Sequence, residues 1–403
     1  MPLEKRPSPR SIFGLSWMIF FLSDVRPGIG PFLSIFLKSY LKWSSDWVGL
    51  ALGTMDLTAA LSQIPCGLLV DALKIKRAFL FCSCLAISLG CLIILYIPQF
   101  STVIFAQALI GLAAAIIPPA IAAITLGLVG RKQLPKRISL NETWGHAGNV
   151  ATAGIVALAG YLLGSTWILY FVIFFACASV FCLSFINPKE IDHSAARELA
   201  IDSDGRQEKP IQIYKFLKES YLLIFCFSVF LFHFANAAQL PLIGQLLSLK
   251  NAAMSSLFMG GCIILAQVVM VVVAYSLGFA MNHIGRKPIF LLGLAILPLR
   301  ATLYTLTLNP IALLAIQLLD GIGAGIFGVI GVITISDIAK GTGRFNFSLS
   351  LMALSQGIGA SLSNVMAGYV VSQLGFNSGF LMLACIGLFG LFFFGIFMPE
   401  TKN

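Results

Sequence analysis

The chain has 403 residues, of which 58% are hydrophobic and only 10% are charged, and its mean hydropathy is +0.94. A soluble globular protein carries roughly 25% charged residues, and it could not bury this much apolar surface. The same figures exclude a disordered chain and a small disulfide-stabilised scaffold. The composition therefore predicts a protein that crosses a membrane several times.

Long apolar stretches follow one another along the whole chain. A helix needs about 20 mostly apolar residues to cross the ~30 Å hydrocarbon core of a bilayer, and each stretch has a length near this value. The sequence predicts an all-α integral membrane protein with twelve transmembrane helices, over residues 12–37, 47–70, 78–97, 102–129, 139–164, 166–186, 219–245, 256–281, 289–308, 310–333, 348–374 and 378–398.

Most of the 26 Lys and Arg residues fall at the N-terminus, at the C-terminus and in the even-numbered loops between the predicted helices. Only Lys38, Lys42 and Lys250 fall in the loops on the opposite side. Because basic residues accumulate in cytoplasmic loops, both termini are predicted to be cytoplasmic and the protein to lie in the cytoplasmic (inner) membrane. The net charge of +10 is explained by this pattern, and it indicates no nucleic-acid partner.

One long polar segment divides the predicted helices into two groups of six. Its mixed charges, together with Gly205 and Pro210, are typical of a solvated linker. The sequence therefore predicts an N-terminal bundle over residues 1–187, a cytoplasmic linker over 188–218 and a C-terminal bundle over 219–403.

Two pairs of segments resemble each other at nearly equal offsets along the chain. Residues 107–116 match residues 317–326, and the basic loop at 67–77 matches the loop at 278–287. Two matches with nearly the same offset indicate a duplicated six-helix unit. In transporters built from such repeats, the substrate site lies at the repeat interface near the middle of the membrane.

The 6+6 duplication and the basic loop after the second and eighth predicted helices resemble the major facilitator superfamily of secondary transporters. Its loop pattern is Gly-x-Leu-x-Asp-Arg/Lys-x-Gly-Arg/Lys-Arg/Lys. The residues that fit are Gly67, Leu69, Asp71, Lys76 and Arg77 in the first copy, and Gly278, Gly285, Arg286 and Lys287 in the second, where Asn282 replaces the aspartate. The segment that begins at Asp24 also resembles the first helix of a little-characterised bacterial branch of this superfamily.

The resemblance implies two pseudo-symmetric six-helix bundles and a gate made by charged ends of facing cytoplasmic helices. The alternative is that these lysines and arginines only set the topology, although this does not account for Asp71. The predicted gate comprises Gly67, Asp71, Lys76, Arg77, Arg137, Glu142, Asn282, Gly285, Arg286 and Lys287. Two marks of the superfamily's drug/proton antiporters are absent, because Gln107 replaces an arginine of the fourth helix and Asn149 follows Gly148 where a proline is typical.

Ionisable residues within the predicted helices are candidates for a solute or proton site, because burying a charge in the membrane costs a few kcal/mol without a partner or a wet cavity. Asp24 and Arg26 precede Pro27 and Gly28, which weaken the first helix. They would bind solute and titrate, or would form a structural ion pair. Asp56 and Asp320 lie inside the second and tenth helices. Asp320 is a candidate proton or solute site, or else pairs with Arg300, which we interpret as structural.

Neutral polar side chains add further candidates for the same central cavity. His146 could relay protons, or could be a neutral structural residue. The predicted set also contains Gln107, Asn149, His233, Asn236, Gln239 and Gln317. Of these, His233, Asn236 and Gln239 would either bind the solute or bridge neighbouring helices. Glu142 is nearer to the cytoplasmic end, where it is expected to form an ion pair of the gate.

These observations predict a transporter that moves a small organic solute by alternating access and is coupled to protons. Arg26 favours an anion, such as a metabolite or a carboxylate siderophore. Efflux of drugs or amphiphiles by proton antiport is the alternative, and a non-transporting sensor is a remote one. No enzyme motif, metal-ligand spacing or cofactor motif stands out, and we expect a monomer whose partners are its solute, protons and the lipid bilayer.

Overall fold

The computed structural model describes residues 7–23, 29–192, 220–280, 284–340 and 345–401. Within these ranges the chain is helical and contains no strand. Helices of the first half are α1 (Pro9–Leu22), α2 (Ile29–Ile35), the π-helical turn η1 (Phe36–Tyr40), α3 (Ser45–Ala72), α4 (Lys76–Tyr96), α5 (Phe100–Leu162), α6 (Thr166–Leu183) and the 3₁₀ turn η2 (Pro188–Glu190). Those of the second half are α8 (Ser220–Asn236), α9 (Gln239–Ser248), α10 (Ala252–Ala280), α11 (Arg286–Tyr304), α12 (Pro310–Ile338), α13 (Phe345–Leu374) and α14 (Phe376–Phe397).

Helical segments overlap all twelve predicted stretches, which agrees with the predicted all-α membrane fold. Eight segments of the described chain are long and apolar enough to cross a membrane by length and composition. The fourth and fifth predicted helices are joined, because α5 continues through residues 131–138 with a kink at Gly130. Gly130 has φ 67°, a left-handed conformation that glycine adopts without steric cost.

Local sequence signals fix several helix ends. Asn309 precedes Pro310, and its side chain accepts a hydrogen bond from the backbone N–H of Ile311 at 2.9 Å, which caps α12. Ser8 caps α1 in the same way, also directly before a proline. Gly375, with φ 84°, separates α13 from α14. The predicted helix ends therefore rest on ordinary capping and turn chemistry.

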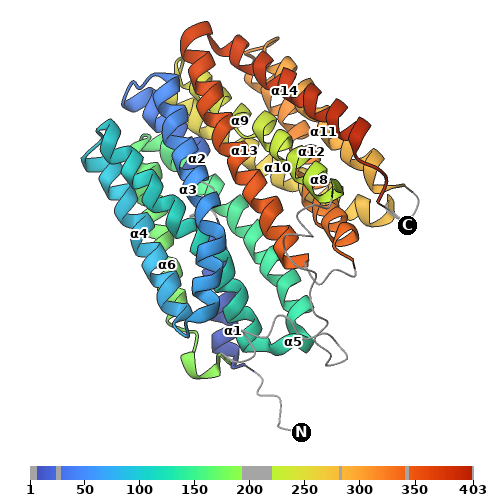
Figure 1. Cartoon of the computed structure of the whole chain (residues 1–403). Coiled ribbons are helices and arrows are strands. Elements are labelled where there is room, and N and C mark those ends of the chain that lie inside the picture. The colour runs from blue at the N-terminus through green and yellow to red at the C-terminus, as the bar shows by residue number, and fades with distance from the viewer. Residues whose placement is uncertain (1–6, 24–28, 193–219, 281–283, 341–344, 402–403) are drawn as a thin grey trace.

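The buried apolar residues separate by half of the chain. One cluster joins buried residues between Leu15 and Ile191 and adds Met259, and two others join buried residues between Leu222 and Met398. Figure 1 shows the long helices side by side, with α3, α4 and α6 on one side, α11, α12 and α14 on the other, and α13 next to α3. Each half thus has its own core.

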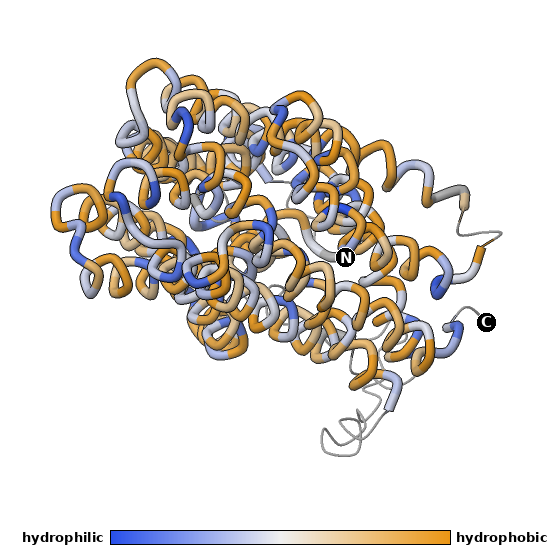
Figure 2. The backbone as a smooth tube through the Cα atoms, turned by 90° about the horizontal axis from the view of Figure 1, so that it is seen from above, coloured by the Kyte–Doolittle hydropathy of each residue, from blue (hydrophilic) through white to orange (hydrophobic). Residues whose placement is uncertain are grey.

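Many large apolar side chains point outward, among them Leu68, Phe181, Ile311 and Phe392. In Figure 2 hydrophobic residues recur along most of the helices, whereas hydrophilic ones are scattered among them. A soluble monomer rarely exposes apolar patches of more than a few hundred Å², so this surface is suited to lipid. The chain is a multi-pass membrane protein.

The bundle has two ends that we name by their loops. The basic end carries the loops at 73–75, 284–285 and 339–340, together with η2. The opposite end carries the loops at 41–44, 163–165, 249–251 and 305–309. Because successive helices run in opposite directions, the position of a residue within its helix shows which of the two ends it is nearer to.

Candidate functional site

A cavity of about 260 Å³ lies between the two halves. The first half contributes residues from α2 and α3, and the second half contributes residues from α8, α9, α11, α12 and α13. Its lining combines apolar, amide and charged groups: Gly30, Pro31, Leu52, Met55, Asp56, Asn236, Ala237, Leu240, Pro241, Arg300, Asp320, Ala360 and Asn364. A mixed lining in the middle of an apolar bundle is typical of a site for a small polar molecule.

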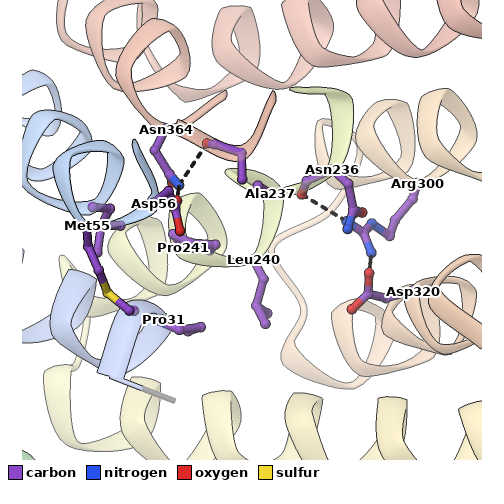
Figure 3. A pocket seen from close by; sticks show the side chains of 13 residues that line it. Pro31, Met55, Asp56, Asn236, Ala237, Leu240, Pro241, Arg300, Asp320 and Asn364 are labelled. Carbon is purple, nitrogen blue, oxygen red and sulfur yellow. Dashed lines mark hydrogen bonds and ion pairs between the residues drawn. The ribbon is translucent and has the colours of Figure 1, made fainter. Parts of the chain in front are cut away.

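One wall of the cavity is built around Arg300 of α11, which is only 1% exposed. Its Nη1 forms an ion pair with Oδ1 of Asp320 on α12. Its Nη2 donates to Oδ1 of Asn236 at 2.7 Å, and its Nε donates to Oε1 of Gln239 at 2.8 Å. Figure 3 shows Arg300 between Asn236 and Asp320. Three helices therefore hold one guanidinium, which leaves its charge neutralised by Asp320.

The polar network continues away from the cavity along α11 and α12. Oδ2 of Asp320 accepts a hydrogen bond from Nε2 of Gln317 at 2.7 Å. Oε1 of Gln317 in turn accepts from the hydroxyl of Tyr304 at 2.6 Å. Because Gln317 and Tyr304 are buried, each of these groups needs its partner, and the network fixes the position of Asp320.

The helix that the sequence predicts over residues 219–245 is broken beside this wall. α8 ends at Asn236 and α9 begins at Gln239. The backbone carbonyl of Asn236 accepts from Nη2 of Arg300 at 3.5 Å, and the backbone N–H of Ala238 donates to Oγ of Ser363 at 3.0 Å. Broken helices at membrane depth are tolerated where other groups satisfy the backbone in this way.

The facing wall presents Asp56 of α3. Its Oδ2 accepts a hydrogen bond from Nδ2 of Asn364 on α13 at 3.0 Å, which joins the two halves (Figure 3). The same Nδ2 also donates to the carbonyl of Ala360 at 3.2 Å. Within the described residues Asp56 has no cationic partner, because the described ion pairs are Arg300–Asp320 and Arg286–Asp337. Asp56 is therefore a cavity carboxylate whose described partner is a neutral amide.

Asp56 lies within a close contact between α3 and α13, which we call the α3–α13 seam and define by Gly49, Gly53, Ser361 and Asn364. A Cβ atom at Gly49 would lie 2.2 Å from the carbonyl oxygen of Asn364. Oγ of Ser361 donates to the carbonyl of Gly53 at 2.7 Å. Only glycine allows two helices to approach this closely, so the seam holds the halves together beyond the cavity, toward the opposite end.

A second contact between the halves joins α5 and α10. A Cβ atom at Gly260 would lie 2.3 Å from Cβ of Ala157, so these helices are also closely packed. Nδ1 of His146 hydrogen-bonds to Oε1 of Gln267 at 2.8 Å across the same contact. Gly260 and Ala157 lie toward the opposite end, as the α3–α13 seam does, whereas His146 and Gln267 lie nearer to the middle of the bundle. We infer that the described conformation is closed at that end.

Other predicted cavity residues lie away from the lining given above. Gln107 is fully buried, and its Nε2 donates to the carbonyl of Ala51 at 3.3 Å. His233 contacts the ring of Phe327, with centroids 4.7 Å apart. Gln239 lies behind Arg300, and Gln317 behind Asp320. Asn149 is partly buried on α5, with its Oδ1 unpartnered among the described residues.

The predicted gate residues lie at or near the basic end. Nη2 of Arg77 donates to the carbonyl of Leu183 at 3.1 Å, and Nη2 of Arg137 donates to Oγ of Ser16 at 2.8 Å. Further gate residues also contact residues of their own half. Lys76 contacts the carbonyl of Val70, and Arg286 forms an ion pair with Asp337 at 3.3 Å. Gly285 and Lys287 lie beside Glu400.

Glu142 is exposed on α5 and forms no ion pair with the described residues, unlike the expected gate contact. Gly67 lies within α3, and Asp71 lies in its last turn. Asp24, Arg26 and Asn282 lie outside the described residues. The predicted Asp24–Arg26 site therefore lies outside the described part of the chain.

The sequence predicts Arg300 to be structural and does not include it among the cavity residues; in the structure its guanidinium holds three helices together and Arg300 also lines the cavity. Its pairing with Asp320, which the sequence left as an alternative, is present. Sequence reasoning also missed Asn364, Ser361 and Gln267. A signal existed for Asn364, since it is an amide in an apolar stretch, but nothing in the sequence paired it with Asp56.

A cavity lined by both halves of a helical bundle, with buried charges and a broken helix beside it, is typical of a secondary transporter. The family model of the Major Facilitator Superfamily matches residues 12–277 and 267–403. The chain belongs to this superfamily of secondary transporters, which confirms the resemblance drawn from the loop motifs.

Relatives and solved structures agree with this assignment. Two Mycobacterium tuberculosis proteins, from strains CDC 1551/Oshkosh and ATCC 25618/H37Rv, are each described as an uncharacterized MFS-type transporter. Each is 38% identical over 395 residues, which cover 98% of this chain and 94% of the relative. The fold is similar to that of the nucleoside transporter NupG (TM-score 0.76, 14% identity, 95% of this chain and 98% of the other). It is also similar to that of a D-xylose–proton symporter (TM-score 0.72, 14% identity, 98% of each).

Proposed function

We propose that this protein moves a small organic solute across the cytoplasmic membrane by alternating access, coupled to protons, with both termini in the cytoplasm. The observation that carries the proposal is the position of Asp56. It lines the cavity, it has a neutral described partner, and that partner belongs to the other half. The carboxylate of Asp56 therefore contacts both the cavity and the interface between the two halves.

Asp56 is better suited than Asp320 to carry the proton. Protonation of Asp320 would leave Arg300 buried without its counter-charge, and breaking a buried ion pair costs about 3–5 kcal/mol. Protonation of Asp56 would break no ion pair among the described residues. Asp56 can therefore gain and lose a proton during a cycle while the Arg300 network stays intact.

The hydrogen bond to Asn364 supplies the link between the proton and the two halves. A bond from an amide to an ionised carboxylate is roughly twice as strong as one between neutral groups. Protonation of Asp56 would therefore weaken the α3–α13 seam, and ionisation would strengthen it. A charged Asp56 therefore favours the closed seam, whereas a neutral Asp56 favours separation of α3 from α13.

The volume of the cavity and the solutes named for two structurally similar transporters support a metabolite as the transported solute. Sites for drug-sized ligands measure about 300–1,000 Å³, whereas this cavity measures about 260 Å³. A solved relative with the same fold is described as a D-xylose–proton symporter, and another as a nucleoside transporter. Drug efflux is less well supported. The preference for an anion depends on Arg26, outside the described residues, and stays a prediction, as does the monomeric state.

The test uses purified protein in proteoliposomes. A thermal-shift screen of metabolites, siderophores and drugs at pH 5.5 and 7.5 identifies a ligand, because binding raises the apparent stability. An imposed pH gradient should then drive transport of that ligand by the wild type. Asp56→Asn should show no transport in response to the gradient.

Asp46→Asn is the matched control, because it makes the same chemical change on the same helix, ten positions from Asp56 and outside the cavity lining. It should respond to the gradient as the wild type does. Gradient-driven transport that survives in Asp56→Asn would contradict the assignment of the proton to this residue.

A further inference from the structure

We propose that the solute is a small organic cation whose ammonium group binds to Asp56. This inference rests on the proposed function, because it names the class of molecule that occupies the same cavity. It departs from the anion that the sequence favours, and the reason is the state of the cavity's described charges.

Arg300 is the only cation among the described cavity residues, and it has almost no capacity left for a solute. A guanidinium has five N–H donors. Its four described hydrogen bonds lead to Gln239, Asp320, and both the side chain and the backbone of Asn236. An anion that displaced Asp320 would leave that carboxylate buried without its counter-charge. Arg300 therefore serves the protein rather than an anionic ligand.

Asp56 is in the opposite situation. A carboxylate accepts about four hydrogen bonds through two oxygens. Among the described residues, Oδ2 accepts one from Asn364, and Oδ1 has no donor. Because Arg300 and Asp320 neutralise each other, the described lining keeps the single negative charge of Asp56. An ionised carboxylate beside apolar walls attracts a cation that can donate hydrogen bonds to it.

The rest of the lining limits the shape of that cation. Leu52 and Met55 lie on α3 beside Asp56, and Leu240 lies on α9, so an apolar surface separates the Asp56 wall from the Arg300 wall. Nδ2 of Asn236 has no described partner and is a donor on the far wall. A molecule with an ammonium group, a short apolar part and a hydroxyl or carbonyl group satisfies all three features.

Shared use of Asp56 makes the cation and the proton competitors. When the ammonium ion binds, the proton leaves Asp56 for the compartment to which the cavity is open, and the carboxylate keeps one positive partner. When the cation leaves on the other side, a proton replaces it. One monovalent cation therefore exchanges for one proton, and the exchange moves no net charge.

The experiment compares matched compounds with purified wild-type protein by thermal shift at pH 7.5 and 5.5. The amines are methylammonium, 2-aminoethanol and D-glucosamine. Their neutral counterparts are methanol, ethylene glycol and D-glucose, and their anionic counterparts are acetate, glycolate and D-gluconate. At least one amine should raise the melting temperature while its two counterparts do not, and its apparent affinity should fall at least tenfold at pH 5.5.

Variants then locate the binding site. Asp56→Asn should lose the response to the amine, whereas Asp56→Glu, which keeps the charge, and Asp46→Asn should retain it. The wild-type comparison stands even where Asp56→Asn does not fold. The inference would be overturned if no amine raised the melting temperature. It would also be overturned if an anion raised the melting temperature of the wild type but not that of Arg26→Ala. Binding is measured without a gradient, so amine binding without gradient-driven transport would contradict only the proposed coupling.

Discussion

Asp56 of α3 and Asn364 of α13, 308 positions apart in the chain, are joined by a hydrogen bond of 3.0 Å across the interface of the two halves. Both residues also line the cavity. The contact therefore connects solute binding with the separation of the halves, since neither residue can move without changing both. Glycines beside it bring the two helices close enough for the contact to form.

Filling the α3–α13 seam should open the cavity at the opposite end. In Gly49→Ala, the new Cβ would meet the backbone of Asn364 at 2.2 Å, so the helices must move apart. We expect faster labelling of Met55→Cys by a membrane-impermeant maleimide added on that side, in a variant whose exposed cysteines Cys82, Cys177 and Cys385 are alanines.

Gly328→Ala on α12 is the control for this substitution, because the Cβ atom at this helical position would meet nothing within 4 Å, and Gly328 belongs to neither the predicted gate nor the cavity lining. Its labelling rate should equal that of the parent. Equal rates in Gly49→Ala and the parent would show that the seam does not close the cavity.

Arg300 and Asp320 should behave as one unit in stability measurements. Asp320→Asn alone leaves the guanidinium buried without its counter-charge, which should cost about 3–5 kcal/mol of unfolding free energy. Arg300→Gln alone should cost a similar amount. The double variant should cost less than the sum of the two, as measured by denaturant unfolding in detergent. Strictly additive effects would mean that the two residues are not coupled.

The hydroxyl of Tyr304 should contribute through Gln317. Tyr304→Phe removes a buried hydrogen bond of 2.6 Å and leaves Oε1 of Gln317 without its donor. The expected loss is about 1–3 kcal/mol of unfolding free energy. Tyr369→Phe at an exposed position should change it by no more than about 0.5 kcal/mol. A loss in Tyr304→Phe no larger than in Tyr369→Phe would contradict the described network.

Glu190 of η2 should make stability depend on acid pH. The backbone N–H of Ser8 donates to its carboxylate at 3.0 Å and lowers the pKa of Glu190 below its usual value. A lowered pKa in the folded state stabilises the protein above the unfolded pKa of about 4.3, and this contribution is lost as the pH falls through the folded pKa. The melting temperature of the wild type should exceed that of Glu190→Gln at pH 7, and the difference should shrink as the pH falls through the folded-state pKa of Glu190. A difference that does not change with pH would exclude this origin.

Much of the fold was predictable because lipid imposes a simple rule on sequence. Each predicted stretch overlaps helical structure among the described residues, since a membrane-crossing segment must be both apolar and internally hydrogen-bonded. The break between Asn236 and Gln239 was not predicted, because the glycine and the proline of the segment, Gly244 and Pro241, both lie beyond the break. The break depends on donors and acceptors from Arg300 and Ser363, which are distant in sequence.

The site was predicted in part for the same reason. A buried charge is visible in the sequence, so Asp56 and Asp320 were found. Which charges meet is a property of helix packing, and single-sequence patterns do not give it. The pairing of Arg300 with Asp320 was therefore only an alternative in the sequence analysis, and the role of Asn364 was missed. His146, Gln107 and Gln239 show the converse: they are polar and lie within the bundle, but their described contacts are with other helices.

The central claim is that the two halves alternate around the cavity, and paired spin-label distances test it most directly. Labels at Lys42 and Leu374 report on the opposite end, and labels at Ile75 and Lys340 report on the basic end. In lipid, a change of pH from 7.5 to 5.5 should lengthen the first distance and shorten the second. Distances that stay constant, or that change in the same direction at both ends, would contradict alternation.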